Sequence, residues 1–394
     1  MGGISRTVVA LGVVSLLTDM SSEMIFPLLP VFLSTVLLTG ASSLGVIEGF
    51  AETTSSLFKL ISGSISDRLR KRKILILGGY GLSGLVRPLI GLAVIWPFIL
   101  GIRILDRLGK GLRSSPRDAL IADVTEKKIR GRAFGFHRSM DHAGAVLGPV
   151  IAALLLFFGF SLRDVFFFAA IPALFVVIVI VGFVKDAPSG SKDASSSFST
   201  VPSVAGGGLA NDRAFLRLLA AIFLFTLGNS SDAFFLLLLN NQGVSPIHIS
   251  LLWSAHHVVK MVSTYVGGRL SDRLGHRRMI LGGWIYYSII YFAFAATQNV
   301  QFLILIFLFY GVYYGLTEPS EKALIADIVH PEFRGRAYGI YQAAVGLGAL
   351  PASLLFGILW EKFGSAFAFY SGAGFALISV LLLGAHSLQM KRAE

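Results

Sequence analysis

The strongest constraint in this sequence is an internal repeat. The segment ALIAD at Ala119–Asp123 returns unchanged at Ala323–Asp327, and RGRAFG at Arg130–Gly135 returns as RGRAYG at Arg334–Gly339. Both pairs keep one order and one separation of 204 positions (123 and 327, 130 and 334). This spacing indicates two copies of one structural unit, each about half of the 394 residues.

Two weaker pairs agree with this repeat. Gly63–Arg68 (GSISDR) resembles Gly268–Arg273 (GRLSDR), and Ser21–Glu23 (SSE) resembles Ser230–Asp232 (SSD). In a membrane protein, repeated halves are typical of a transporter whose binding site lies where the halves meet.

The composition places the repeat in a membrane. Hydrophobic residues make up 54% of the chain and charged residues only 14%. Apolar runs of roughly 20 residues, enough to cross about 30 Å of hydrocarbon, recur along it. These runs are continuous rather than alternating, so we expect helices and not a barrel. The expected spans are residues 8–38, 43–66, 73–95, 98–124, 130–158, 163–184, 213–240, 246–271, 278–297, 300–326, 334–362 and 366–388.

The predicted fold is an all-α integral membrane protein with twelve transmembrane helices in two pseudo-symmetric six-helix bundles. We expect the N-terminal bundle at residues 1–186 and the C-terminal bundle at residues 212–394. Residues 187–211 lie within the one polar, Ser- and Gly-rich stretch, which is typical of a flexible cytoplasmic linker.

The net charge of +12 comes from basic residues that are unevenly distributed between the connections of the spans. Lys and Arg gather in alternate connections, at Arg68–Lys73, Lys127–Arg132, Arg273–Arg278, Arg334–Arg336 and Lys391–Arg392. The intervening connections are almost uncharged, as the positive-inside rule requires. We therefore expect the cytoplasmic (inner) membrane, both termini in the cytoplasm, and anionic lipid headgroups rather than nucleic acid as neighbours of these loops.

The loop after the second span carries a family resemblance. Gly63–Arg72 (GSISDRLRKR) resembles the G-x-L-a-D-r-x-G-r-r signature of the major facilitator superfamily. It departs at Arg70, whereas the second copy keeps the glycine as Gly275. In the family this loop latches the halves in one state. The resemblance therefore implies gating roles for Asp67, Arg72, Asp123, Asp272 and Asp327. A solvated basic loop that only sets topology is the alternative.

The fifth span resembles the antiporter motif of the same superfamily. The residues that carry this resemblance are Gly135, Gly144, Gly148 and Pro149. Small residues let helices approach closely and proline interrupts the backbone ladder. The second copy has its proline at Pro351 instead. This asymmetry favours export over import, although an ordinary close helix crossing would use the same glycines.

The fourth span is unusually basic. Its ionisable residues fall on one helical face. They are Arg103, Asp106, Arg107, Lys110, Arg113 and Arg117. Arg103 matches the arginine of the family's fourth-helix motif, which in the family is linked to substrate or proton coupling. We predict that Arg103, Asp106, Arg107 and Lys110 bind substrate. Because arginine pairs well with carboxylate and phosphate, the substrate would be anionic or zwitterionic.

Acidic residues within spans are the predicted proton carriers, because an ionisable group in the bilayer is costly. Asp19 and Glu23 lie one turn apart in the first span, and Glu48 and Glu52 share a face of the second. Proton and substrate competing for one carboxylate would couple their movements. The alternative is a permanent structural ion pair between these acids of the first span and Arg103 or Arg107.

The second half has fewer ionisable residues within its spans. We predict substrate contacts from Asp232, His256 and Glu318, in a wall that is otherwise more apolar. No histidine pair has the i, i+4 spacing of a metal site, cysteine is absent, and no ATP-binding P-loop occurs. We therefore expect neither metal nor cofactor.

The function predicted from these features is secondary active transport by alternating access. We expect a monomer that exports a small anionic or zwitterionic organic solute or drug in exchange for protons. Two alternatives are proton-symport import of an organic anion or siderophore, and broad-range export of lipophilic cations. A membrane sensor and an intramembrane enzyme are disfavoured, because neither an output domain nor a catalytic set is recognisable.

Overall fold

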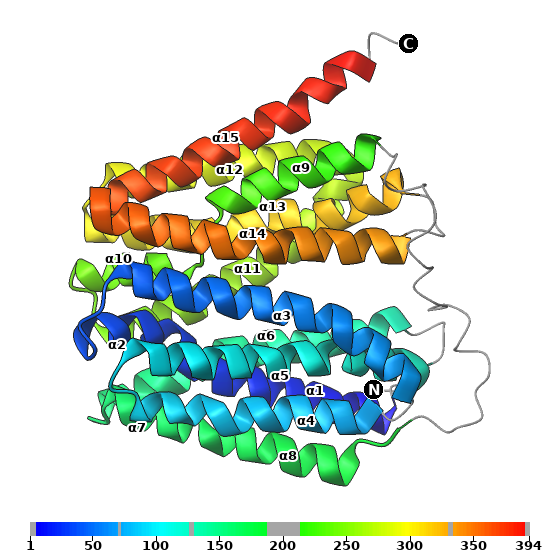
Figure 1. Ribbon diagram of the computed structural model, residues 1–394, viewed down its shortest axis with the longest axis vertical. Helices are drawn as coiled ribbons and strands as arrows, with labels where there is room; N and C mark the ends of the chain where they lie inside the picture. The colour runs from blue at the N-terminus through cyan, green and yellow to red at the C-terminus, as the bar shows by residue number, and fades with distance from the viewer. Residues whose placement is uncertain (1–4, 70–71, 126–129, 187–212, 330–333, 391–394) are drawn as a thin grey trace. The chain divides into compact units, whose positions relative to one another are not determined.

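A computed structural model describes residues 5–69, 72–125, 130–186, 213–329 and 334–390. Every regular element in these ranges is a helix (Figure 1). The helices are α1 (Arg6–Ile25), η1 (Phe26–Leu28), α2 (Leu29–Thr35), α3 (Ala41–Leu69), α4 (Arg72–Val86), η2 (Arg87–Leu92), α5 (Trp96–Asp123), α6 (Arg130–Phe157), α7 (Leu162–Phe168), α8 (Ala170–Phe183), α9 (Arg213–Gly228), α10 (Ala233–Asn241), α11 (Pro246–Leu274), α12 (His276–Ala296), α13 (Val300–Ile328), α14 (Arg334–Phe363) and α15 (Ser365–Met390). The predicted linker, residues 187–211, lies outside the described ranges.

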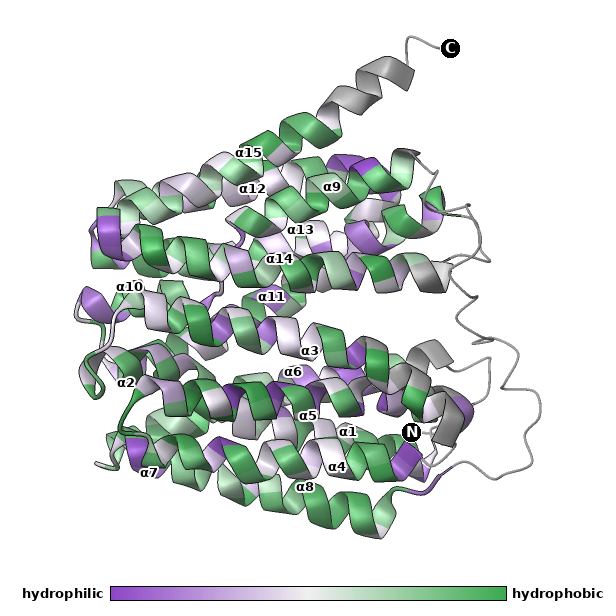
Figure 2. Cartoon of the chain, in the orientation of Figure 1, coloured by the Kyte–Doolittle hydropathy of each residue, from purple (hydrophilic) through white to green (hydrophobic). Residues whose placement is uncertain are grey.

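These helices account for the twelve predicted spans, since α1 with η1 and α2, α4 with η2, α7 with α8, and α9 with α10 each make one span. Within the described residues, nine spans are long and apolar enough to cross a membrane. The three others, α3, α5 and α11, carry most of the ionisable residues singled out above, and polar segments interrupt α5 in Figure 2. The prediction of an all-helical membrane fold is confirmed.

The first span of each half is broken. Pro27 and Pro30 interrupt the first span at η1, because proline has no N–H for the helix ladder. In the second half the break covers Asn229–Asp232, between α9 and α10. Each break lies at or within a few residues of an acid, Glu23 in the first half and Asp232 in the second. These two acids occupy corresponding positions in the repeat.

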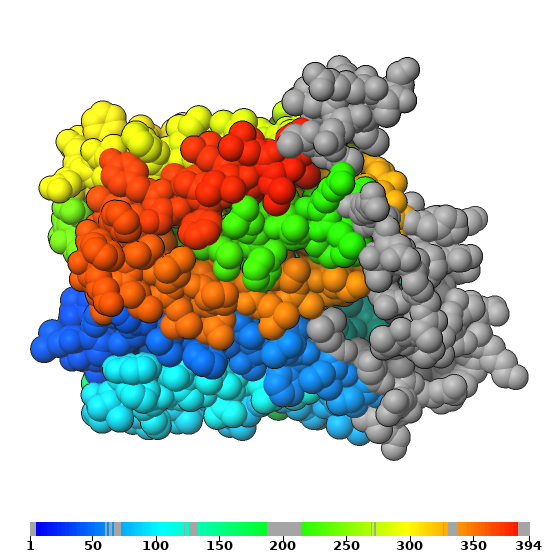
Figure 3. Space-filling view, turned by 45° about the horizontal axis from the view of Figure 1, so that its top comes forward, coloured from blue at the N-terminus to red at the C-terminus, as the bar shows by residue number. Residues whose placement is uncertain are grey.

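The described residues divide into two compact units. The first falls within Met1–Thr39, Phe50–Ser197 and Gly243–Ser254, and the second within Gly40–Gly49, Phe198–Gln242 and Ala255–Glu394. In the first unit, α1 packs on α6 and α8, and α4 packs on α5 (Figure 1). In the second, α12 packs on α13 and α15, while α9 lies against α14 and α15 on the face shown in Figure 3.

Candidate substrate and proton sites

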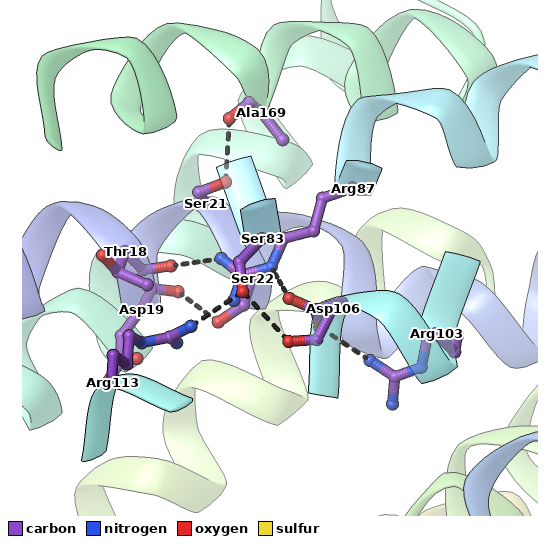
Figure 4. Close-up of polar contacts among 10 residues, drawn as sticks. All are labelled: Thr18, Asp19, Ser21, Ser22, Ser83, Arg87, Arg103, Asp106, Arg113 and Ala169. Atoms are coloured by element: carbon purple, nitrogen blue, oxygen red, sulfur yellow. Dashed lines mark hydrogen bonds and ion pairs between the residues drawn. The ribbon is translucent and has the colours of Figure 1, made fainter. Parts of the chain in front are cut away.

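The centre of the first unit is a buried ion-pair network around Asp106 of α5. Arg87 Nε lies 2.7 Å from one carboxylate oxygen of Asp106, and Arg103 Nη1 lies 3.8 Å from the other (Figure 4). Arg87 Nη1 also donates to the backbone carbonyl of Thr18, at 3.0 Å. All three charged side chains are buried. The network therefore joins η2, α5 and α1.

Arg113 has protein partners of its own further along α5. Its Nη1 donates to Ser83 Oγ at 2.7 Å, and its guanidinium lies 4.4 Å from the centroid of the Tyr80 ring. Ser83 Oγ in turn donates to the backbone carbonyl of Asp106 (Figure 4). The basic stripe is thus divided, because Asp106 and Arg113 are held by α4 and η2 within the protein core.

Arg107 and Lys110 lie in a different environment on α5. The carboxylate of Glu52 on α3 experiences the charges of Arg107, Lys59 and Lys110. Lys110 also experiences the charge of Asp19 on α1. Acidic and basic side chains of α1, α3 and α5 therefore act on one another here, and Arg107 and Lys110 are both half-buried.

Asp19 and Glu23 are half-buried, one turn apart on α1. Neither makes an ion pair with Arg103 or Arg107 among the described residues, so the structure does not show the predicted alternative of a fixed pair. Glu23 Oε2 instead accepts a hydrogen bond from the indole Nε1 of Trp253, at 2.7 Å. Trp253 belongs to the stretch of α11 that packs in the first unit. The charges of Lys110 and Arg113 act on the Asp19 carboxylate.

The glycines of the antiporter-like motif contact α1 at these two acids. A Cβ atom on Gly144 would lie 3.0 Å from the Cβ of Asp19, and one on Gly148 would lie 3.1 Å from the Cβ of Glu23. Pro149 follows inside α6, and Gly135 lies in the first turns of this helix. The glycine motif and the acid pair were predicted separately, but they lie together where α6 crosses α1.

The second predicted acid pair, Glu48 and Glu52, lies one turn apart on α3, which contributes residues to both units. Glu48 is buried and lies in the stretch of α3 assigned to the second unit, where Gly49 packs against Leu350 of α14. Glu52 belongs to the first unit, where the charges of Arg107 and Lys59 act on its carboxylate.

Three of the predicted gating residues take part in polar contacts at equivalent places in the repeat. Arg72 Nη1 at the start of α4 lies 2.7 Å from Asp123 Oδ2 at the end of α5. In the second half, His276 Nε2 at the start of α12 lies 3.5 Å from Asp327 Oδ2. Positions 72 and 276 are 204 apart, as are 123 and 327. The side chains of Asp67 and Asp272 lie outside the described part of the chain.

In the second unit, Asp232 lies at the helix break and accepts two hydrogen bonds from α13. Tyr310 Oη donates to Oδ1 at 2.9 Å and Tyr314 Oη donates to Oδ2 at 2.6 Å. The Nζ of Lys260 lies 3.5 Å from the centroid of the Tyr314 ring. Asp232 precedes α10 without capping it, so its side chain is free to face α13.

Aromatic rings surround this carboxylate, and sequence reasoning missed them. They include Tyr287, Tyr291, Tyr310, Tyr313 and Tyr314, with Phe225 stacked on Trp284. The signal was present, because these tyrosines recur three or four residues apart on two helices. The expectation of a more apolar wall is wrong here, since the tyrosine hydroxyl groups hydrogen-bond the acid and the broken backbone.

The other predicted residues of the second half have distinct surroundings. The buried His256 ring stacks on Phe307, and its Nδ1 lies 3.1 Å from the carbonyl of the same residue. Glu318 pairs with Lys322 at 3.3 Å in an exposed position. A carboxylate outside the predicted set, Glu321, is buried and accepts from Tyr341 Oη at 2.7 Å. Among the described residues, no group of three or more His, Asp or Glu side chains could hold a metal ion.

Tyr287, on α12, donates a hydrogen bond to the backbone at the break between α9 and α10. Its hydroxyl group donates to the carbonyl of Gly228, the last residue of α9, at 3.0 Å. Tyr287→Phe keeps the ring but leaves this buried carbonyl unsatisfied, which costs about 1–3 kcal/mol. We expect a lower midpoint of thermal unfolding in detergent. Tyr370→Phe, at an exposed position on α15, is the control and should leave the midpoint unchanged.

Twelve helical spans in two repeated halves, nine of them apolar enough to cross a membrane among the described residues, with charged and hydrogen-bonded groups inside the spans, define a multi-pass membrane transporter. The family model of the Major Facilitator Superfamily matches residues 11–242 and 233–392. The chain belongs to the major facilitator superfamily.

Individual relatives agree with this assignment. An uncharacterized MFS-type transporter of Methanocaldococcus jannaschii is 34% identical over 96% of this chain and 94% of its own length. The multidrug resistance protein MdtG of a Rahnella species is 26% identical over 90% of this chain and 87% of its own. The solved structure of the nucleoside transporter NupG has a TM-score of 0.80 at 13% identity, covering 97% of this chain and 99% of that one, and shows the shared fold.

Proposed function

We propose that the chain exports an organic solute in exchange for protons, and that Asp19 and Glu23 carry the protons. The observation that supports this most is the crossing of α1 and α6. Two half-buried carboxylates face the glycines of the antiporter-like motif there, and neither has an ion-pair partner among the described residues. An unpaired carboxylate can accept and release a proton without breaking a structural salt bridge.

Lys110 connects this acid pair to the substrate in the proposed mechanism. Its charge acts on Asp19 and Glu23, and Arg107 lies on the same helix nearby. The Lys110 ammonium holds an acidic group of the substrate, while a cationic group of the substrate and a proton compete for the carboxylate of Asp19. Protonation of Asp19 therefore releases the substrate, and loss of the proton allows the next substrate molecule to bind. Asp106 and Arg113 are scaffold in this proposal, because protein partners hold them.

Export of lipophilic cations is the second candidate. The relatives named as multidrug resistance proteins favour it, and so do the acids that offset part of the basic stripe. The two candidates differ in whether a substrate needs an acidic group.

For orientation and gating, the proposal follows the charge pattern. Both termini and the basic loops lie in the cytoplasm of a cell whose inner membrane holds the protein as a monomer. The Arg72–Asp123 and His276–Asp327 pairs then stabilise one of the two access states on that side.

The test uses purified protein in proteoliposomes that contain a pH-sensitive dye. Fluorescein, glycyl-leucine and tetraphenylphosphonium are added as an anion, a zwitterion and a lipophilic cation, under an imposed proton gradient. We expect proton flux that depends on one of these probes, and a fall of at least about tenfold in Asp19→Asn, because a neutral amide cannot carry the proton. Asp164→Asn, at an exposed helix cap, should retain the flux. Probe transport without proton movement would overturn the coupling.

A further inference from the structure

We propose that Asp232, Tyr310 and Tyr314 form a subsite for the ammonium group of an organic cation or zwitterion, and that the side chain of Lys260 occupies this subsite when no ligand is bound. The role of the subsite in transport rests on the proposed function, but its ligand chemistry can be tested separately.

The carboxylate of Asp232 is held in a fixed orientation. The helix break places it beside α13, where the two phenolic hydroxyl groups donate to both of its oxygens. These donors are neutral, so they fix the orientation of the carboxylate without cancelling its charge. No cationic side chain forms a salt bridge with Asp232 among the described residues. A carboxylate whose two oxygens already accept hydrogen bonds is suited to a cation that offers no N–H donors of its own.

The ring of Tyr314 already binds an ammonium group. At 3.5 Å from the ring centroid, Lys260 Nζ lies well inside the range of a cation–π interaction. The same tyrosine donates its hydroxyl group to Asp232. One side chain therefore links an aromatic face that holds a cation with the carboxylate that would attract it.

Neighbouring rings hold this arrangement in place. Tyr310 is fully buried and stacks between His256, at 5.6 Å and 16°, and Tyr313, at 5.8 Å and 11°. Tyr314, Asp232 and Lys260, in contrast, are half-buried. The stacked rings therefore hold Tyr310 in place, whereas Tyr314, Asp232 and Lys260, which would contact a ligand, are partly accessible.

Lysine is suited to act as an internal occupant of such a site. Its ammonium is a compact charge on a flexible four-carbon chain, so it can leave the ring without movement of α11. Because it is tethered, it competes with free cations at a high effective concentration. Removal of this ammonium should therefore raise the affinity for an external one.

Choline and its uncharged carbon isostere, 3,3-dimethylbutan-1-ol, are the probes for the test. Binding to detergent-solubilised protein is measured by titration calorimetry, without any proton gradient. We expect Lys260→Met to bind choline about tenfold more tightly than the unaltered protein, and the isostere to bind at least about tenfold more weakly than choline. Adding Asp232→Asn or Tyr314→Leu to Lys260→Met should remove the gain.

Lys362→Met removes an exposed lysine from α14 and is the matched control, which should leave choline binding unchanged. Equal binding of choline and its isostere by Lys260→Met, or no gain on removing Lys260, would overturn the subsite. Choline binding that survives in a protein without proton-coupled flux would overturn the proposed transport mechanism and leave the subsite standing. A circular dichroism spectrum of each variant separates lost binding from lost folding.

Discussion

Asp106→Ala is expected to be the most destabilising single substitution in the first unit. It removes the buried carboxylate that pairs with Arg87 Nε at 2.7 Å and lies 3.8 Å from Arg103 Nη1, and Arg87 is the side chain that loses its ion-pair partner. Removing one partner of a buried ion pair leaves an uncompensated charge in a low dielectric, which typically costs about 3–5 kcal/mol. We expect poor recovery from the membrane and a large fall in the midpoint of thermal unfolding.

Two further variants make this expectation specific. Arg87→Met combined with Asp106→Leu replaces the pair by apolar groups of similar size, and should regain much of the lost stability. Asp118→Asn breaks the Arg117–Asp118 pair, whose carboxylate is exposed, and should cost only about 0–1 kcal/mol. If Asp106→Ala unfolds at the same temperature as Asp118→Asn, then the Asp106 network does not stabilise the fold.

Gly144→Leu should have the second large effect, because it separates α6 from α1 where the two acids lie. Even a Cβ at this position would meet the backbone carbonyl of Leu16, and backbone cannot rotate away as a side chain can. Overpacking of this kind costs about 1–3 kcal/mol. We expect lower thermal stability, and loss of proton-coupled flux in the protein that remains folded.

Gly182→Ala is the matched control on a helix of the same unit. A Cβ at Gly182 meets no atom within 4 Å, so only the helix propensity changes, with a gain of roughly 0.5–1 kcal/mol. Unchanged stability and flux in Gly144→Leu would show that the α1–α6 crossing tolerates a wider spacing. The antiporter-like motif would then have no structural basis at this position.

The fold was predictable from the sequence because hydrophobic length and repetition are local properties. A run of roughly 20 apolar residues has few alternatives to a membrane helix. The same reasoning found Asp19 and Glu23, since a separation of four residues fixes a common helix face. Exact ends were less predictable: α3 extends over Ala41–Leu69, beyond the expected 43–66.

The partners of these residues could not be predicted in the same way, because they come from helices distant in sequence. Asp106 seemed available to substrate until the fold placed Arg87 beside it. Arg87 itself is an arginine inside an apolar span, and such a position indicates a buried partner for its charge. Tyr310 and Tyr314 were missed because tyrosine adds little to a charge pattern, although their spacing puts both on one face.

The two ion pairs at equivalent positions of the repeat differ in one respect. Arginine keeps its charge at any physiological pH, so Arg72 presents a cation to Asp123 whenever the two side chains meet. The His276–Asp327 contact becomes an ion pair only when the imidazole is protonated. The repeat therefore places a guanidinium opposite the acid in the first half and an imidazole opposite the equivalent acid in the second, so the two halves share one geometry but not one chemistry at this contact.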